Sequence, residues 1–165
     1  MINDRHVNVA EALAKLPGPV GERNVYVLKP RGRVLALSAD QNALLMQVGA
    51  ILATGNVALV ETGNPAAKLL ARLPAHVAAR VASVAQWQGA DHVAGILYAG
   101  GREELRALNQ AAARREGPIV LVHGVSLAGL AAGSEDYALE WLLEEVCVST
   151  NTAAAGGNAN LMTIG

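Results

Sequence analysis

Apolar residues in the middle of this chain alternate between the spacing of helices and the short continuous runs of buried strands. The clearest helix is predicted in SADQNALLMQVGAILATGN, residues 38–56, where the apolar positions form one continuous stripe. Ser38 or Asp40 can accept hydrogen bonds from the free amides at its start, and Gly55 can end it in the left-handed conformation. The stripe consists of Leu44, Leu45, Val48, Ile51 and Leu52.

Strands and helices continue to alternate from residue 56 to residue 123, with short connections between them. This alternation predicts right-handed βαβ units, a mostly parallel sheet and a three-layer, Rossmann-like α/β domain. The predicted strands are 56–61, 81–85, 93–98 and 118–124. The predicted helices are 64–73, a short one before 81, 102–117 and 134–146. Pro65 occupies the first position of the helix over 64–73. In helix 102–117, Glu103 and Glu104 near the start and Arg114 and Arg115 near the end complement the helix dipole. Tyr137, Trp141 and Leu142 are expected to share a face of helix 134–146.

Two further features are predicted before this alternation begins. Residues 3–16 are interpreted as a linker or a short helix. Residues 25–28 and 34–37 are two extended runs joined by KPRG, a turn in which Gly32 is free to take a positive φ, so we expect an N-terminal hairpin or flap near 25–37. The expected organisation is therefore 1–16 as linker or short helix, 17–148 as the Rossmann-like domain and 149–165 as an extended C-terminal tail.

Composition supports one α/β domain and excludes several classes of protein. Of the 165 residues, 52% are hydrophobic, 16% charged and 3% aromatic, so the core must consist of Ala, Val, Leu and Ile in thin layers. A net charge of -1 and an isoelectric point near 6.4 give no excess of positive charge that would attract nucleic acid or an anionic membrane. No apolar run approaches the roughly 20 residues of a membrane span. The chain start lacks a secretory signal and Cys147 is the single cysteine, so a cytoplasmic location is expected.

The best candidate for a ligand-binding turn is LYAGGREELR, where a predicted strand runs through Gly100-Gly101 into a helix. In doubly wound sheets, ligands bind beyond the carboxyl ends of the strands. A dinucleotide fingerprint needs three glycines, however, and only two are present here. Glu103 and Glu104 at the helix start would also repel phosphate. A vestigial or weak NAD- or nucleotide-binding module is therefore kept only as the alternative interpretation.

HGVSLAG contains a serine that could suggest a hydrolase. A nucleophile elbow requires G-x-S-x-G because the sharp turn needs small residues on both sides of the serine. Gly124 satisfies the first position, but the next glycine, Gly129, lies three residues after Ser126. His123 also precedes the serine, which is not the chain order of that fold. We interpret this segment as a strand followed by a glycine-rich loop.

The remaining reactive side chains have structural interpretations. Glu144 and Glu145 lie close to Cys147 in sequence and disfavour a thiolate, so this cysteine is predicted to be a small buried core residue. Arg31 and Arg33 are interpreted as charges on a solvated strand edge. The histidines lack a carboxylate or cysteine at a metal-ligand spacing, and no metal site is predicted. They are His6, His76, His92 and His123.

The chain closes with NTAAAGGNANLMTIG, residues 151–165, which carries no charge and ends on aliphatic side chains. A glycine cradle for phosphate needs a following helix, but only eight residues follow Gly157. Disordered ends are usually charged and poor in aliphatic residues. These properties favour a segment that docks on another backbone and adds a strand to it. Asn151, Asn158 and Asn160 could satisfy the backbone groups of such a partner.

STNTAAAGGNANLMTIG closely resembles the closing motif of the long forms of proline utilization A. These bacterial bifunctional enzymes combine proline dehydrogenase with pyrroline-5-carboxylate (L-glutamate gamma-semialdehyde) dehydrogenase. LPGPVGERNVYVLKPRGRVLAL and EGPIVLVHG also resemble the C-terminal domain of that family, so the resemblance covers about residues 16–165.

The resemblance implies an aldehyde dehydrogenase superfamily-like domain with no catalytic residue, cofactor or metal of its own. FAD and NAD are then expected in the proline dehydrogenase and aldehyde dehydrogenase domains of a full-length enzyme. The domain is expected to cover the substrate-channelling cavity, and its closing motif to stabilise the aldehyde dehydrogenase domain, its expected partner. A homo-oligomer formed through the hairpin or the tail is a further expectation. The expected docking residues are Asn151, Thr152, Gly156, Gly157, Asn158, Asn160, Leu161, Met162 and Ile164.

Overall fold

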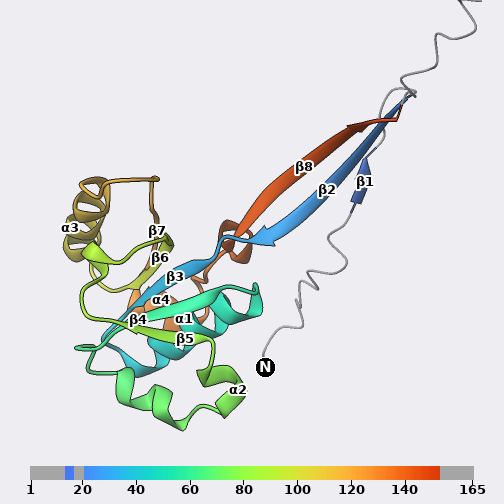
Figure 1. The fold of residues 1–165 in the computed structure, drawn as a ribbon. Coiled ribbons are helices and arrows are strands. Elements are labelled where there is room, and N and C mark those ends of the chain that lie inside the picture. Colours follow the sequence, from blue (N-terminus) through green and yellow to red (C-terminus); the bar gives the residue numbers. More distant parts are fainter. Residues whose placement is uncertain (1–13, 17–20, 153–165) are drawn as a thin grey trace, which may run out of the picture. The chain divides into compact units, whose positions relative to one another are not determined.

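The computed structural model describes residues 14–16 and 21–152, which form two compact units (Figure 1). The larger unit consists of residues 30–144, and the smaller unit combines residues before 30 with residues after 144. The larger unit is built on a five-stranded sheet and the smaller one on a three-stranded sheet. Within the described ranges, no helix is long and apolar enough to cross a membrane.

The sheet of the larger unit confirms the predicted parallel arrangement. Its strands are β3 (Arg33–Leu37), β4 (Val57–Glu61), β5 (Val81–Val84), β6 (Val93–Ala99) and β7 (Leu121–Val125). All neighbouring strands are parallel, in the order β5-β4-β3-β6-β7. The chain therefore starts in the middle, moves outward to one edge and returns to build the other edge. The strand order reverses between β3 and β6, as it does in doubly wound sheets.

Helix α1 (Gln41–Ala53) follows β3, and its two ends are formed as predicted. The Asp40 carboxylate accepts a hydrogen bond from the Ala43 amide at 2.8 Å, which satisfies one of the free donors of the first turn. Gly55 follows the helix with a φ of 82°. A Cβ at this position would lie 2.8 Å from Pro30 Cγ, so both the backbone conformation and the available space require glycine.

The connections after β4 and β6 differ in regularity. Residues 102–117 form helix α3 (Arg102–Ala113), with Glu103 and Glu104 in its first turn as predicted. Residues 64–73 form the 3₁₀ helix η1 (Ala67–Arg72) instead of the predicted α-helix. The Asn64 side chain accepts from the Ala66 amide at 2.8 Å, and this local turn replaces the start of a regular helix. The short segments are α2 (Ala75–Ala78), η2 (Trp87–Gly89), α4 (Leu127–Ala132) and η3 (Leu139–Leu142).

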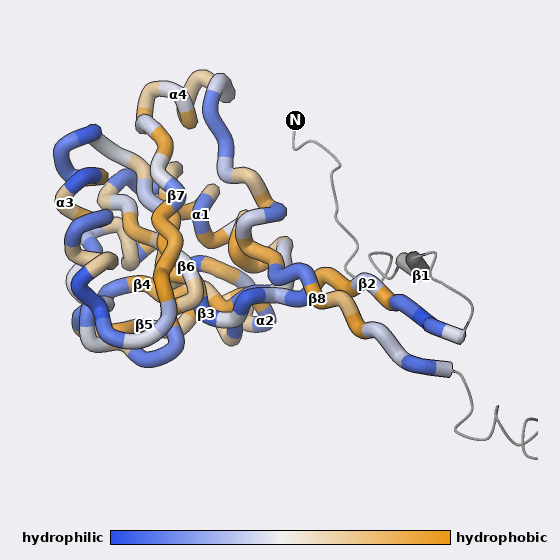
Figure 2. Tube along the Cα trace, turned by 90° about the horizontal axis from the view of Figure 1, so that it is seen from above, coloured by the Kyte–Doolittle hydropathy of each residue, from blue (hydrophilic) through white to orange (hydrophobic). Residues whose placement is uncertain are grey.

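Both faces of the five-stranded sheet are covered, because successive residues of a strand point to opposite faces. On one face, Val34 and Ala36 of β3 belong to a core cluster with Leu44 and Ile51 of α1. On the other face, Leu35 of β3 belongs to a second cluster, together with Leu59, Ile96, Trp87 and Leu108. Figure 2 shows these central strands mostly in orange, as expected for a parallel sheet buried on both sides.

The helix predicted over 134–146 is wrong. Residues 139–142 form η3, and the chain continues from Leu143 as strand β8 (Leu143–Asn151). Tyr137 is held in the core before η3, where its hydroxyl accepts from Gln47 Nε2 at 2.8 Å and donates to the Tyr98 carbonyl at 3.1 Å. These long-range contacts and the pairing of β8 outweigh the local helical pattern.

The smaller unit contains β8, β2 (Glu22–Pro30) and β1 (Ala14–Leu16), with β2 in the middle. β1 pairs with β2 in antiparallel fashion, Ala14 opposite Tyr26. The arrows of β2 and β8 point in opposite directions in Figure 1. The Ser149 hydroxyl donates to Asn24 Oδ1 at 2.5 Å and the Thr152 amide to the Gly21 carbonyl at 2.7 Å.

The predicted hairpin over 25–37 is also wrong. Gly32 has the expected positive φ of 116°, but β2 pairs with β1 and β8, whereas β3 is the central strand of the other sheet. Residues 14–16 are likewise a strand rather than the end of a helix over 3–16, the rest of which lies outside the described residues. The residues of the turn between β2 and β3 do not indicate that β2 pairs with β8, a strand more than 100 residues further along the chain.

Candidate functional sites

A cavity of about 340 Å³ lies at the carboxyl ends of β3, β4 and β6, where the strand order reverses. This is the place at which doubly wound sheets bind their ligands, and the sequence analysis expected any ligand there. The cavity is lined by Leu37, Ser38, Ala39, Glu61, Gly63, Asn64, Pro65, Tyr98 and Ala99. No Lys or Arg is among them, so the lining supplies no cation to pair with a phosphate.

The Gly100-Gly101 turn next to this cavity is occupied by the chain's own side chains. A Cβ at Gly100 would collide with the Tyr98 hydroxyl, and one at Gly101 would collide with the Glu104 carboxylate. Burial raises the pKa of Tyr98 and the nearby Glu104 charge adds to this rise, while a hydrogen bond with the Gly101 backbone opposes it. The Tyr98 hydroxyl and the Glu104 carboxylate thus lie against the two glycines, and a negative carboxylate at this helix start disfavours a phosphate there.

The other polar groups of the cavity are engaged in local hydrogen bonds. Glu61 Oε1 accepts from the Trp87 amide at 3.1 Å. Asn64 Nδ2 donates to the Ser38 carbonyl at 2.9 Å. These bonds join the turns that follow β3 and β4 to each other, and the end of β4 to the start of η2. They give the cavity a structural explanation that does not need a ligand.

Ser126 is a helix cap in this structure and lacks the surroundings of a nucleophile. Its hydroxyl accepts from the Gly129 amide at 3.0 Å and donates to Glu135 Oε1 at 2.8 Å. The Ser126 amide donates to Glu135 Oε2 at 2.6 Å, and these two bonds lower the pKa of Glu135. A hydroxyl that donates to a carboxylate and accepts from an amide has no histidine base. The loop expected after the strand is thus the short helix α4.

His123 lies between two aromatic rings. Its ring centroid is 5.5 Å from that of Tyr137 in an edge-on arrangement and 5.4 Å from that of Trp141. Burial lowers the pKa of His123, and the charges of Glu140 and Asp136 oppose this shift. Nδ1 is buried without a hydrogen-bond partner. In the portion of the chain that the structure describes, no group of three His, Cys, Asp or Glu side chains could hold a metal ion.

Cys147 is exposed, so its prediction as a buried core residue is wrong. It belongs to β8, where most side chains are exposed, rather than to the sheet of the larger unit. The prediction rested on the preference of a free cysteine for buried positions, and a strand with mostly exposed side chains does not provide such a position.

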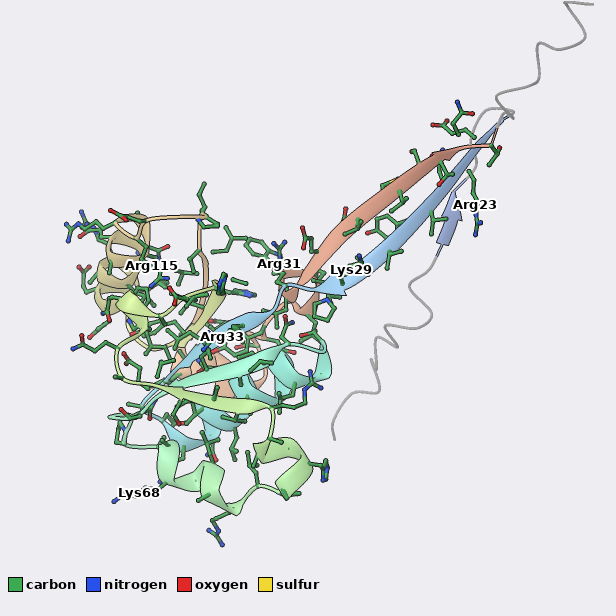
Figure 3. All side chains as sticks on the ribbon, in the orientation of Figure 1. Arg23, Lys29, Arg31, Arg33, Lys68 and Arg115 are labelled. Carbon is green, nitrogen blue, oxygen red and sulfur yellow. The ribbon has the colours of Figure 1, made fainter. Side chains whose placement is uncertain are left out.

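Arginine side chains secure irregular segments of the larger unit, a role that the sequence analysis missed (Figure 3). Arg31 Nε donates to the Trp141 carbonyl at 2.8 Å, and Arg33 Nη1 donates to the Asp91 carbonyl at 3.1 Å. Both were interpreted as a solvated strand edge, whereas Arg33 lies on the central strand β3. Only the tertiary structure brings these carbonyls within reach.

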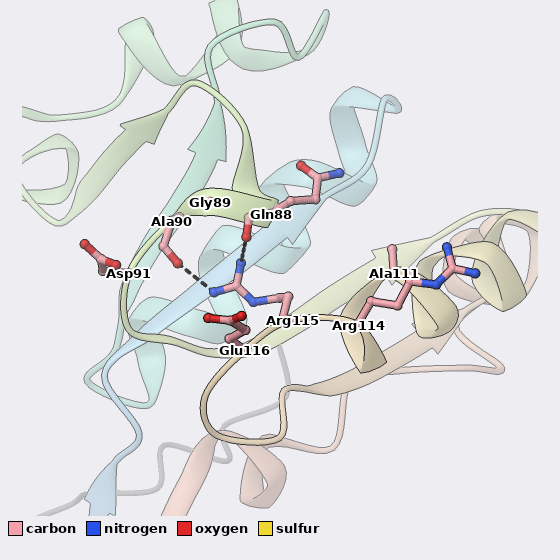
Figure 4. Close-up of a pocket in the computed structure, with 8 residues that line it drawn as sticks. All are labelled: Gln88, Gly89, Ala90, Asp91, Ala111, Arg114, Arg115 and Glu116. Atoms are coloured by element: carbon pink, nitrogen blue, oxygen red, sulfur yellow. Dashed lines mark hydrogen bonds between the residues drawn. The ribbon is translucent and has the colours of Figure 1, made fainter.

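Arg115 provides the strongest example, in a polar cavity of about 530 Å³ at the end of α3 (Figure 4). Its guanidinium donates to the carbonyls of Trp87 and Ala90, each at 2.6 Å, and to the Gln88 carbonyl. It also lies 5.7 Å from the centre of the Trp87 ring. Because its guanidinium serves three carbonyls and an aromatic ring, Arg115 has a structural role that joins the end of α3 to the segment around η2.

Two of the expected docking residues fall within the described structure. Asn151 is the last residue of β8, and Thr152 donates its amide to Gly21. Both side chains are exposed. The others lie outside the described residues: Gly156, Gly157, Asn158, Asn160, Leu161, Met162 and Ile164.

No protein-family model matches this chain. Among curated proteins, the bifunctional protein PutA of Rhizobium meliloti is 45% identical over 151 residues, which are 92% of this chain and 12% of that protein. Its counterpart in Salmonella typhimurium is 46% identical over 151 residues, 91% of this chain and 11% of that protein. This chain therefore spans only 11–12% of the length of these relatives.

Solved structures with a similar fold include relatives of the same kind. A mutant of Bradyrhizobium japonicum proline utilization A has a TM-score of 0.57 and 25% identity, covering 72% of this chain and 14% of that one. An NAD-dependent benzaldehyde dehydrogenase from Corynebacterium glutamicum has a TM-score of 0.53 at 18% identity, covering 70% of this chain and 29% of that one. The second likeness is one of fold alone.

Proposed function

Because this chain is homologous to the C-terminal region of the bifunctional PutA proteins, we propose that it forms a non-catalytic accessory domain of such an enzyme. The larger enzyme would oxidise proline to glutamate in the cytoplasm, through proline dehydrogenase and pyrroline-5-carboxylate dehydrogenase. FAD and NAD would be bound by those two domains and not by this one.

The observation that carries the proposal is the match over 92% of this chain to a bifunctional PutA protein. A second observation comes from the cavity at the reversal of strand order, where a cofactor of a Rossmann-like domain would bind. The Tyr98 hydroxyl and the Glu104 carboxylate occupy the Gly100-Gly101 turn there. Such a turn supports a domain that retains the fold of a nucleotide-binding unit without its ligand.

We assign this domain the role of covering the cavity through which the intermediate passes, and of stabilising the aldehyde dehydrogenase domain through residues 149–165. The tail supports this role because it has no charge and ends on aliphatic side chains, as expected of a segment that adds to another sheet. β8 ends at Asn151 and Thr152 follows it directly, so an extended strand leads up to residue 153.

Deleting residues 149–165 from the full-length enzyme tests this role. The deletion should lower aldehyde dehydrogenase activity or lengthen the lag in coupled NADH production, while proline dehydrogenase activity changes little. A variant in which a Gly-Ser sequence of equal length replaces the tail separates the loss of specific docking from the loss of chain length. Coupled kinetics that equal those of the intact enzyme would exclude the role.

The second candidate function is a residual nucleotide-binding module, favoured only by the position of the cavity at the strand reversal. Calorimetric titration of this chain with NAD distinguishes the two. A dissociation constant in the micromolar range would favour nucleotide binding and contradict the interpretation of the Gly100-Gly101 turn.

A further inference from the structure

His123 of β7 is a half-buried titratable side chain that the proposed function does not use. Its ring meets that of Tyr137 edge-on at 5.5 Å and lies 5.4 Å from that of Trp141, inclined by 31°. Tyr137 is 3% exposed and held in the core, whereas Trp141 keeps 51% of its surface exposed. Trp141 is therefore the partner that can leave the histidine, because turning its ring into solvent uncovers only the half that is now buried.

The backbone at Trp141 is anchored independently of its ring. The Trp141 carbonyl accepts from Arg31 Nε at 2.8 Å, and the Leu142 carbonyl accepts from Asn56 Nδ2 at 2.8 Å. Leu142 itself is 3% exposed and belongs to the core cluster around α1. These contacts hold η3, so the Trp141 side chain can move while the segment that carries it stays in place.

The surroundings of His123 suit the neutral ring. A protonated imidazole carries an N–H on both nitrogens. Nδ1 is buried without a hydrogen-bond partner, so a proton there would be enclosed with no acceptor from the described residues. A cavity of about 10 Å³ reaches the ring, which is at the lower limit of the space that one water molecule needs. Arg31 lines the same cavity, and its positive charge disfavours a second cation.

The groups that favour a positive His123 are weaker than its burial. Asp136 and Glu140 attract the charged ring, but both are exposed, so solvent screens their carboxylates. The Trp141 ring also attracts a cation, yet a half-exposed indole gains less from this contact than an enclosed, unpaired N–H costs. On β6, the residue opposite His123 is the uncharged Leu97. Burial accordingly outweighs the carboxylates and lowers the pKa of His123.

We propose that the contact between His123 and Trp141 is an acid-sensitive latch. The neutral His123 ring holds the Trp141 ring against β7, and a proton on His123 releases the Trp141 ring into solvent. Release uncovers the histidine, so water can then accept a hydrogen bond from the protonated ring. The latch goes beyond the proposed function and does not depend on it, because every group that forms it belongs to the larger unit of this chain.

The direction of the pH dependence follows from the proton affinities of the two states. In the released state His123 has the ordinary histidine pKa of about 6.5, whereas burial lowers its pKa in the latched state. The released state therefore binds the proton more readily, and a falling pH shifts the population toward it. The latch is closed above about pH 6.5 and opens as the pH falls from there through the pKa of the latched state. Tyr137 keeps its proton throughout, since its pKa is raised to about 12.

Nuclear magnetic resonance of this chain tests the latch directly. Nuclear Overhauser effects between the ring protons of His123 and Trp141 should be present at about pH 7.5 and decrease at least about fivefold at about pH 5. The chemical shifts of the Trp141 indole should change with the same midpoint as those of the His123 ring. Overhauser effects that persist once His123 is protonated would overturn the proposal. A His123 ring that stays neutral down to about pH 5 would also overturn it.

Two substitutions identify the group that takes the proton. His123→Phe keeps an aromatic ring beside Trp141 but cannot be protonated, so the Trp141 indole shifts should no longer change between the two pH values. His76→Phe replaces an exposed histidine of α2 and is the matched control, which should retain the transition of the parent chain. A transition that survives in His123→Phe would overturn the proposal. Circular dichroism at both pH values distinguishes local release from general unfolding, and unfolding of the whole parent chain at about pH 5 would overturn it as well.

Discussion

Replacing Tyr137 by Phe removes one buried hydroxyl and should destabilise the larger unit by about 2 kcal/mol. Tyr137 is 3% exposed, and its hydroxyl joins three segments that are distant in sequence. It accepts from Gln47 Nε2 at 2.8 Å and donates to the Tyr98 carbonyl at 3.1 Å. Phe keeps the ring and its packing, so the change isolates these two hydrogen bonds.

The magnitude follows from what the substitution leaves behind. Gln47 is completely buried, and its Oε1 already lacks a partner. Without the Tyr137 hydroxyl, its Nε2 would also be unpartnered, and leaving one buried polar group unsatisfied costs about 1–3 kcal/mol. A loss of about 2 kcal/mol corresponds to a decrease of roughly 4–8 °C in melting temperature for a chain of this size.

Urea unfolding followed by circular dichroism measures this loss. Tyr26→Phe is the matched control, because the Tyr26 hydroxyl belongs to the smaller unit and faces Glu145, and it should leave the urea midpoint of the larger unit unchanged. Gln47→Leu combined with Tyr137→Phe should cost less than the sum of the single changes, since both buried partners are then apolar. A single Tyr137→Phe variant within about 0.5 kcal/mol of the parent chain would refute the reasoning.

Two further predictions concern pH and helix capping. Burial raises the pKa of Tyr137 to about 12, and a hydrogen bond from Gln47 opposes this rise. In the unfolded chain, Tyr137 loses its proton near pH 10. The contribution of its hydroxyl to stability should therefore be fully present below pH 10 and decrease as the pH rises toward 12. The urea midpoints of the parent and Tyr137→Phe chains should converge over that range. Asp40→Ala should lower stability by about 1 kcal/mol, whereas Asp40→Asn should lower it less because the amide oxygen still caps α1; equal losses in thermal melts would contradict the capping role.

The local features of this protein were predictable because they depend on residues close together in sequence. Helix α1, with the Asp40 cap and the left-handed Gly55, was predicted correctly, since a helical stripe and its caps span only a few turns. The strands β4, β6 and β7 were predicted from short aliphatic runs between turns. Their alternation with helices was sufficient to predict a parallel sheet covered on both faces.

The candidate sites were predictable only in part. The two glycines and two glutamates of LYAGGREELR argued against phosphate from the sequence alone. The sequence did not show that the Tyr98 hydroxyl lies against Gly100. Tyr98 precedes this glycine by two residues, and the direction of its side chain depends on the tertiary environment. Ser126 was placed in a loop, although its role as the cap of α4 depends on the nearby Gly129 amide; only its bonds to Glu135 needed the tertiary structure.

By itself, the sequence determined the α/β class with a mostly parallel sheet, helices α1 and α3, the strands β4, β6 and β7, and the relationship to the PutA proteins. These properties follow from periodicity and composition, which each segment carries within itself. The tertiary structure decided which strands pair: β2 with β8 instead of with β3, and β8 in place of a predicted helix. It also decided that Cys147 is exposed and that Arg115 holds three distant carbonyls. Such contacts join residues far apart in the chain, and their energies appear only once folding has brought the partners together.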